Sequence, residues 1–424
     1  MKNYEHQQRI VDEDPKRTGL WLGTGSGKTR IALLLARGRT LVICPKTQRE
    51  DRNWEREAKE NDMDIDLTVI SKETFRRDWA SLPQFETVIV DEAHTCLGVT
   101  PNTRQRRRVE VPRASQLYDA LDMYLRVNPP KRLYLATATI LRSPMTVWGA
   151  SQLLGFDWNF YEFRQTFYTR LPMPGREVWV SKTDTATKER LAQAVHKLGY
   201  VGRLEDYFDV PSQTHRTVHL TLSEKQKQRI KDMRIEYPEP IARVGKIHEI
   251  ENGVLNGDEF TPPEHFDSTK IDAILDLALE FPRMVVFARY TLQIEAIEQA
   301  LTDKGYTVFK LTGATKDRGE LFERAKQAQE GIFLAQASIS SGWELPEYPT
   351  MVFASRTFSF VDYDQALGRI QRVNNIKKNL YINLVVKGGV DERVDEALRQ
   401  KQDFNEKLYL SGSEELNFIE QEKV

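Results

Sequence analysis

A glycine-rich segment near the N-terminus has the residue types that bind phosphate. It reads Gly23-Thr24-Gly25-Ser26-Gly27-Lys28-Thr29, after the apolar run Leu20–Leu22 and before an amphipathic stretch. Glycines let backbone N–H groups turn toward phosphate oxygens, and the following helix adds the positive end of its dipole. In such a loop Lys28 contacts the β- and γ-phosphates and the Thr29 hydroxyl binds Mg²⁺. The strict pattern has glycine where this chain has Leu22, and a flexible glycine-rich turn is the alternative interpretation.

Two adjacent carboxylates follow a second apolar run. Asp91 and Glu92 come directly after Val88-Ile89-Val90, and His94 lies two positions further on. A carboxylate at a strand tip can hold Mg²⁺ while its neighbour polarises an attacking water. We therefore predict Asp91 as a metal ligand, Glu92 as the residue that activates water, and His94 as a coupling residue. Adjacent acids also occur in surface turns, but the upstream phosphate loop favours an ATP site that uses Mg²⁺.

A third group lies near the C-terminus. Gln365, Arg369 and Arg372 fall at i, i+4 and i+7, which places them on one face of a predicted helix. Arginines that reach a γ-phosphate from a second lobe stabilise the charge of phosphoryl transfer. The spacing predicts this catalytic role for Arg369 and Arg372, with Gln365 on the same face. A solvated basic helix face is the alternative.

An arginine-rich segment follows the acidic pair. Residues 104–113 contain one acidic residue, Glu110, and five arginines: Arg104, Arg106, Arg107, Arg108 and Arg113. The flanking prolines, Pro101 and Pro112, predict a loop. Such a loop could lie along a nucleic-acid backbone, with a contribution to affinity that falls as salt rises. A solvated surface loop is the alternative.

The elements that must position these residues alternate along the chain. Short apolar runs at 41–44, 67–70, 87–90 and 133–136 alternate with helical stretches, and the pattern returns from 267 to 408. Buried strands that alternate with helices predict an α/β fold with parallel sheets covered on both faces. The proline-rich middle predicts a connector. We expect a first lobe at 1–170, the connector at 171–213 and a second lobe at 214–424.

Composition excludes several classes of protein. The chain has 424 residues, with 61 Lys+Arg against 62 Asp+Glu and 40% apolar residues. These figures exclude a disordered chain and a uniformly basic nucleic-acid binder. Two cysteines are too few for a disulfide framework, and no run approaches the ~18 apolar residues of a membrane span. We expect a cytoplasmic protein with no membrane partner; a monomer is compatible with the sequence.

These motifs resemble the superfamily 2 helicase-type ATPases, and within them the SNF2/Rad54-like branch of duplex-DNA translocases. In the first half the matching segments are His6-Gln7, Ile43–Thr47, Asn53-Trp54 with Glu57, Asp91–His94, Leu135–Thr139 and RSPMTVWGASQLLGF at 142–156. In the second half they are Arg203–Asp206, Leu220–Ser223 with Gln226, Val285–Phe287, Leu311–Thr315 with Arg318, Ser340–Pro346 and Gln365–Arg372. The chain departs from the branch at Ala138, Ile140 and Glu344.

The resemblance implies two RecA-like parallel-sheet lobes in tandem, in a compact version of the kind found in bacteria and phages. It implies that Gln7 reads the adenine and that Thr137, Thr139 and Gln365 couple the sites. We interpret Glu344, which departs from the family pattern, as an acceptor for a ribose hydroxyl. By the same resemblance, Thr47, Ser340 and Ser341 contact nucleic acid.

The leading hypothesis is an ATP-dependent motor on duplex or branched DNA, compatible with replication, recombination or branch migration. An RNA helicase of the same superfamily and a nucleotide-switched DNA clamp are the alternatives.

Overall fold

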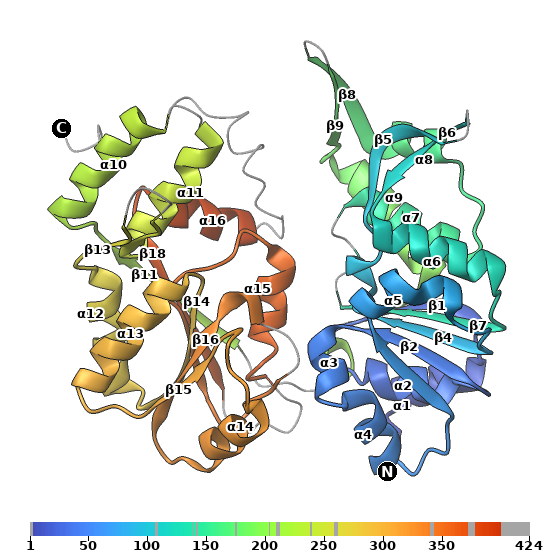
Figure 1. Ribbon diagram of the computed structural model, residues 1–424, viewed down its shortest axis with the longest axis horizontal. Coiled ribbons are helices and arrows are strands. Elements are labelled where there is room, and N and C mark those ends of the chain that lie inside the picture. The colour runs from blue at the N-terminus through green and yellow to red at the C-terminus, as the bar shows by residue number, and fades with distance from the viewer. Residues whose placement is uncertain are drawn as a thin grey trace. The chain divides into compact units, whose positions relative to one another are not determined.

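The computed structural model describes residues 3–106, 109–138, 140, 143–173, 176–202, 204–208, 213–237, 240–257, 262–339, 343–371 and 378–399. The chain divides into two compact units, residues 1–209 and 210–424, which are blue to green and green to red in Figure 1.

The first unit is built on a six-stranded sheet in which every pairing is parallel. In sheet order its strands are β10 (Gly199–Gly202), β1 (Arg17–Leu22), β7 (Arg132–Ala136), β4 (Thr87–Asp91), β2 (Thr40–Cys44) and β3 (Leu67–Ser71). The apolar runs that predicted strands in this half are therefore confirmed. Because all strands run the same way, the residues that follow β1, β7, β4 and β2 meet at one edge of the sheet.

Helices cover both faces of this sheet. They are α1 (Glu5–Glu13), α2 (Lys28–Leu35), α3 (Lys46–Glu50), α4 (Asn53–Glu60), α5 (Lys72–Asp78), α6 (Gln116–Val127), α7 (Pro144–Leu154), α8 (Phe160–Phe167) and α9 (Thr185–Leu198). Successive residues of β4 face opposite cores: Val88 packs with Phe75 and Tyr124, while Ile89 packs with Trp54. This alternation explains why the strand is apolar throughout.

The second unit repeats the plan with a second all-parallel sheet. Its strands, in sheet order, are β11 (Gln213–Leu220), β18 (Asn379–Val386), β17 (Thr350–Phe353), β14 (Arg283–Ala288), β16 (Gly331–Gln336) and β15 (Val308–Leu311). Its helices are α10 (Glu224–Glu236), α11 (Pro240–Glu251), α12 (Thr269–Glu280), α13 (Thr291–Asp303), α14 (Arg318–Gln327), α15 (Phe360–Leu367) and α16 (Val390–Arg399). A small ribbon joins β12 (Val254–Leu255) to β13 (Glu264–His265). The α/β class predicted from the alternation is confirmed in both halves.

Residues 171–208 are not the connector that the prolines predicted. A hairpin of β8 (Tyr168–Met173) and β9 (Arg176–Ser181) comes first, and α9 and β10 follow. Because β10 pairs with β1, this stretch is part of the first unit. Pro172 lies within the two-stranded ribbon, where one side of each strand has no partner and an N–H group is not needed.

The arginine-rich segment is also not a loop. Residues 99–106 form β5 (Val99–Arg106), and residues 109–114 form the antiparallel strand β6 (Val109–Ala114). Figure 1 shows this hairpin near the β8–β9 hairpin on the first unit. A two-stranded ribbon tolerates Pro101 and Pro112 for the same reason that the other hairpin tolerates Pro172.

Candidate functional site

The phosphate-binding segment lies between the end of β1 and the start of α2. Gly25 and Gly27 both have φ of 82°, a left-handed conformation that favours glycine. A Cβ built on Gly27 would come within 2.2 Å of Gln7 Nε2, so the position has no room for a side chain. The tight turn lets Lys28 and Thr29 begin α2, whose first N–H groups have no partner within the helix.

The Lys28 ammonium lies against the first residues of this loop. Its Nζ donates to the carbonyls of Leu22 at 2.8 Å and Gly23 at 3.1 Å. The Ser26 hydroxyl also donates to Gly23 O, at 2.7 Å, and Gly23 N donates to Gly202 O on β10. Left-handed glycines, helix-end N–H groups and a lysine form a donor set that fits a phosphate chain.

The N-terminal helix α1 is joined to the back of the same loop. Gln7 Nε2 donates to Ser26 O at 3.3 Å, and the Gln7 amide oxygen accepts from Tyr4 N. His6 Nε2 lies 2.9 Å from the same Ser26 carbonyl, and its ring stacks on Tyr207 with centroids 4.0 Å apart. Gln7 is therefore placed against the phosphate loop, where a base-reading residue must be. Tyr207 carried no signal in the sequence, because the contact joins residues 201 positions apart.

The acidic pair lies two strands away from the loop. Asp91, the last residue of β4, is buried and accepts a hydrogen bond from Glu92 N at 2.9 Å. Burial and the neighbouring Glu92 carboxylate raise the pKa of Asp91 to about 6. Burial acts the same way on Glu92, but a hydrogen bond from His94 and the charges of Lys28 and Lys72 outweigh it and lower the pKa of Glu92. A carboxylate near a bound cation is favoured in its charged form, so Asp91 suits a metal-binding position.

Glu92, His94 and Thr137 form one cluster of side chains. His94 Nδ1 lies 2.8 Å from Thr137 Oγ1 and 3.4 Å from Glu92 Oε2, and the Thr137 hydroxyl lies 3.5 Å from the same carboxylate oxygen. Thr137 directly follows β7, the strand between β1 and β4. The structure thus brings Thr137 together with Glu92 and His94, which were predicted from a different segment. Thr139 lies outside the described residues.

Thr47 follows the next strand along the edge. It is the second residue of α3, just after β2, and its side chain is half-buried. The carboxyl edge of this sheet therefore presents, in order, the phosphate loop, Thr137, the acidic pair and Thr47.

Lys72 is a residue near the acidic pair that sequence reasoning missed. It directly follows β3, is 7% exposed, and its Nζ donates to Glu92 O at 2.8 Å and to Thr95 Oγ1 at 2.6 Å. Its place right after a strand was the available signal.

In the second unit, the predicted helix is shorter than expected, so Gln365 lies on it and Arg369 does not. Helix α15 ends at Leu367, and Arg369 lies in the turn that follows. The Arg369 carbonyl accepts from Leu345 N at 2.9 Å. Arg369 is 7% exposed, and its guanidinium donates to Gln365 O and Trp343 O, both at 2.9 Å.

The other predicted residues of this unit differ in their exposure. Gln365 is buried and Glu344 is exposed. Arg372, Ser340 and Ser341 lie outside the described residues.

The arginine hairpin is held to the first unit by specific contacts. Arg104 forms an ion pair with Asp119 of α6, and Arg164 of α8 donates to Pro101 O at 3.0 Å. The Arg164 guanidinium in turn stacks over Trp179 of β9 at 4.1 Å, which links the two hairpins. Arg113 is exposed, whereas Arg104 already has an acidic partner. Arg107, Arg108 and the side chain of Arg106 lie outside the described part of the structure.

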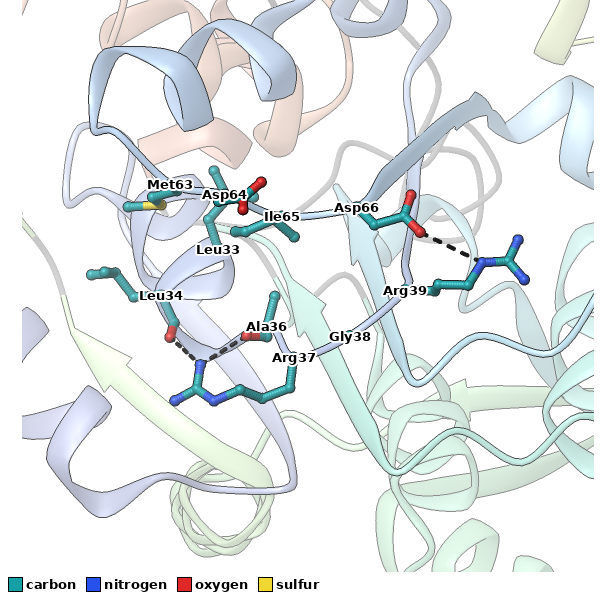
Figure 2. Close-up of a pocket in the computed structure, with 10 residues that line it drawn as sticks. All are labelled: Leu33, Leu34, Ala36, Arg37, Gly38, Arg39, Met63, Asp64, Ile65 and Asp66. Atoms are coloured by element: carbon teal, nitrogen blue, oxygen red, sulfur yellow. Dashed lines mark hydrogen bonds and ion pairs between the residues drawn. The ribbon is translucent and has the colours of Figure 1, made fainter.

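Figure 2 shows a hollow of about 690 Å³ elsewhere on the first unit. It lies between the end of α2 and the start of β2, and Arg39 and Asp66 flank it 3.7 Å apart. The amino end of β2 is opposite the edge that carries the phosphate loop, so this hollow is not part of the candidate site.

Comparisons with known proteins match part of the second unit to a domain family. Residues 269–374 match the model of the helicase conserved C-terminal domain. The protein named "Putative helicase 172L" of Invertebrate iridescent virus 6 is 27% identical over 32% of this chain and 23% of that protein. The chromatin-remodeling ATPase INO80 of Gibberella zeae is 24% identical over 35% of this chain and 8% of that protein. The matched part is thus less than a quarter of either relative.

A solved structure, the Sulfolobus solfataricus SWI2/SNF2 ATPase core in complex with dsDNA, is 16% identical over 97% of this chain and 94% of that chain. Its TM-score is 0.40. In the part of the chain that the structure describes, every helix is too short or too polar to cross a bilayer.

The match to the helicase conserved C-terminal domain lies in the second unit, and the phosphate loop with its acidic pair lies in the first. The names of the two relatives, a putative helicase and a chromatin-remodeling ATPase, agree with the resemblance that the motifs indicated.

Proposed function

We propose that this protein is an ATP-driven motor that moves along duplex or branched DNA. The observation that carries the proposal is the cluster of Glu92, His94 and Thr137 on the sheet edge that also bears the phosphate loop. A residue that activates water is thereby in contact with residues that can report its state to the rest of the unit. The resemblance of the motifs to the SNF2/Rad54-like branch supports DNA as the track.

Each residue of the first unit has a chemical task in this proposal. Lys28 and the N–H groups of α2 bind the phosphates, and Gln7 contacts the adenine. Thr29 and Asp91 would hold Mg²⁺, which neutralises developing charge on the phosphates. Glu92 orients and polarises the attacking water through its ionised carboxylate.

The second unit completes the site in the same proposal. Arg369 and Arg372 supply positive charge to the transferring phosphoryl group, and Glu344 accepts from the ribose. Because Arg369 is bonded to two main-chain carbonyls, its guanidinium is preorganised in the turn after α15. Gln365 fixes that turn through its own carbonyl.

Nucleic-acid contacts are proposed for the rims of both units. Thr47 lies at the carboxyl edge of the first sheet, and Ser340 and Ser341 are assigned by the resemblance alone. The arginines at 106–108 are proposed to contact DNA phosphates from the β5–β6 hairpin, whereas the Asp119 partner of Arg104 makes it the weakest candidate in this set.

The test is ATP turnover with duplex DNA, single-stranded DNA, RNA or no nucleic acid. We expect stimulation by duplex DNA. Stimulation confined to RNA would instead select an RNA helicase, and turnover that no nucleic acid changes would select a nucleotide-switched clamp. Glu92→Gln serves as the control for contaminating ATPase, since it should lose turnover under all four conditions.

A further inference from the structure

Lys72 is a buried cation in a place that local structure does not explain. It is the first residue of α5, where the helix dipole disfavours positive charge. It is 7% exposed and forms no direct ion pair among the described residues, although its charge acts on the nearby carboxylates of Asp91 and Glu92. Moving an ammonium group out of water is costly, so the hydrogen bonds of Lys72 must offset that cost.

Those contacts converge on one carbonyl. Lys72 Nζ donates to Glu92 O at 2.8 Å, and so do Thr95 N at 3.1 Å and the Thr95 hydroxyl at 3.0 Å. Lys72 also donates to the Thr95 hydroxyl at 2.6 Å, which closes a small ring of bonds. Three donors on one oxygen fix the direction of the peptide that follows Glu92.

The peptide needs fixing because Glu92 has an unfavourable backbone. Its φ of 44° and ψ of 50° are in the left-handed region, which costs a residue with a Cβ about 1–2 kcal/mol. This conformation turns the chain sharply after β4. It leaves the Glu92 carboxylate 3.4 Å from His94 Nδ1, instead of directed along the strand.

We propose that Lys72 is a positioning residue for ATP hydrolysis, which holds the left-handed turn at Glu92 and thereby aims the carboxylate. The inference rests on the proposed function. It gives Lys72, which directly follows β3, a role in positioning the acidic pair, which lies two strands away in the sheet.

The test compares Lys72→Met with Lys72→Arg and with Lys59→Met, a matched control at an exposed lysine of the same unit. We measure kcat and KM by phosphate release with duplex DNA, and Mg·ATP affinity by calorimetry. Lys72→Met should lower kcat roughly tenfold to hundredfold, the effect of removing one charge-assisted bond, and change KM and affinity less than about threefold. Lys72→Arg should retain more activity because it keeps a donor, and Lys59→Met should match the parent.

Two further variants separate positioning from folding. Thr95→Val removes the hydroxyl that bonds both Lys72 and the Glu92 carbonyl, and it leaves Lys72 bonded to that carbonyl. It should lower kcat at unchanged KM. If Lys72→Met does not fold, Thr95→Val tests the inference in its place. In a Glu92→Gln background, Lys72→Met should cost nothing more in turnover. Parental kcat in folded Lys72→Met, or in Thr95→Val, would overturn the inference. Full turnover in Glu92→Gln would instead overturn the proposed function itself.

Discussion

The second unit contains a buried ion pair whose removal should be strongly destabilising. Lys270 of α12 is 1% exposed, and its Nζ lies 2.5 Å from Asp391 Oδ2 of α16. The same ammonium donates to Asn252 Oδ1 at 2.6 Å and to Ala354 O at 2.7 Å, so all three of its N–H groups have acceptors. Asp391 also bonds His248 Nε2 at 2.9 Å. This cluster joins α11, α12 and α16.

Replacing Lys270 with Met leaves the Asp391 carboxylate buried without its cation. Breaking one side of a buried pair costs about 3–5 kcal/mol. For a unit of this size each kcal/mol lowers the melting temperature by roughly 2–4 °C, which gives a fall of roughly 6–20 °C. Because the cost comes from the unpaired carboxylate, adding Asp391→Asn to Lys270→Met should cost less than the sum of the two single changes.

Hydrogen exchange read by mass spectrometry is the suitable assay, because it reports each unit separately. Peptides from α12 and α16 should lose protection in Lys270→Met, while those from the first unit should not. Lys304→Met, at an exposed lysine of the same unit, is the matched control. A destabilisation below about 1 kcal/mol with unchanged exchange at α16 would refute the reasoning.

Four other outcomes are expected. Lys28→Ala should weaken Mg·ATP binding itself, which calorimetry measures, because the loop no longer makes a charge-assisted bond to phosphate. Arg369→Ala and Arg369→Lys should both depress turnover with nucleotide affinity largely kept, since a point charge does not reproduce the planar fork; equal turnover in the lysine variant would contradict this. Neutralising the three arginines at 106–108 should reduce the salt slope of DNA binding by about 0.9 for each DNA phosphate that they no longer neutralise, and an unchanged slope would mean a solvated hairpin. Burial and the nearby Asp391 charge raise the pKa of Glu251 to about 8, so the folded state retains a proton that the unfolded chain releases above about pH 4.5. The free energy of unfolding should therefore fall as pH rises through that window, by at most ~1.4 kcal/mol per pH unit, and Glu251→Gln should flatten the slope in urea titrations.

Much of the fold followed from local pattern. Most strands of the two sheets were predictable because they contain a short, continuous apolar run, which a sheet covered on both faces requires. The strand β10 was not, because its sequence Gly199-Tyr200-Val201-Gly202 is short and flanked by glycine. Its place depends on pairing with β1, which is about 180 residues earlier in the chain. Proline was also misleading at the two hairpins, since a ribbon tolerates it and a central strand does not.

The residues of the candidate site also divide into those that a local sequence pattern identifies and those that depend on distant contacts. The phosphate loop and the acidic pair are contiguous in sequence, so their residue types alone identified them. Tyr207 contacts His6, 201 positions earlier in the chain, and such a contact leaves no periodic or motif signal, whereas the only signal for Lys72 was its place after a strand. The helix predicted through Arg369 ends at Leu367, where Gly368 follows and the Arg369 carbonyl accepts a tertiary bond from Leu345.

Movement of this protein along DNA is tested most directly by displacement of a triplex-forming strand from duplex DNA. A protein that only binds or switches leaves the third strand in place, whereas one that moves along the duplex strips it off. We expect ATP-dependent displacement by the parent chain and none by Glu92→Gln under the same conditions. ATP turnover that duplex DNA stimulates, without any displacement of the third strand, would contradict a motor function.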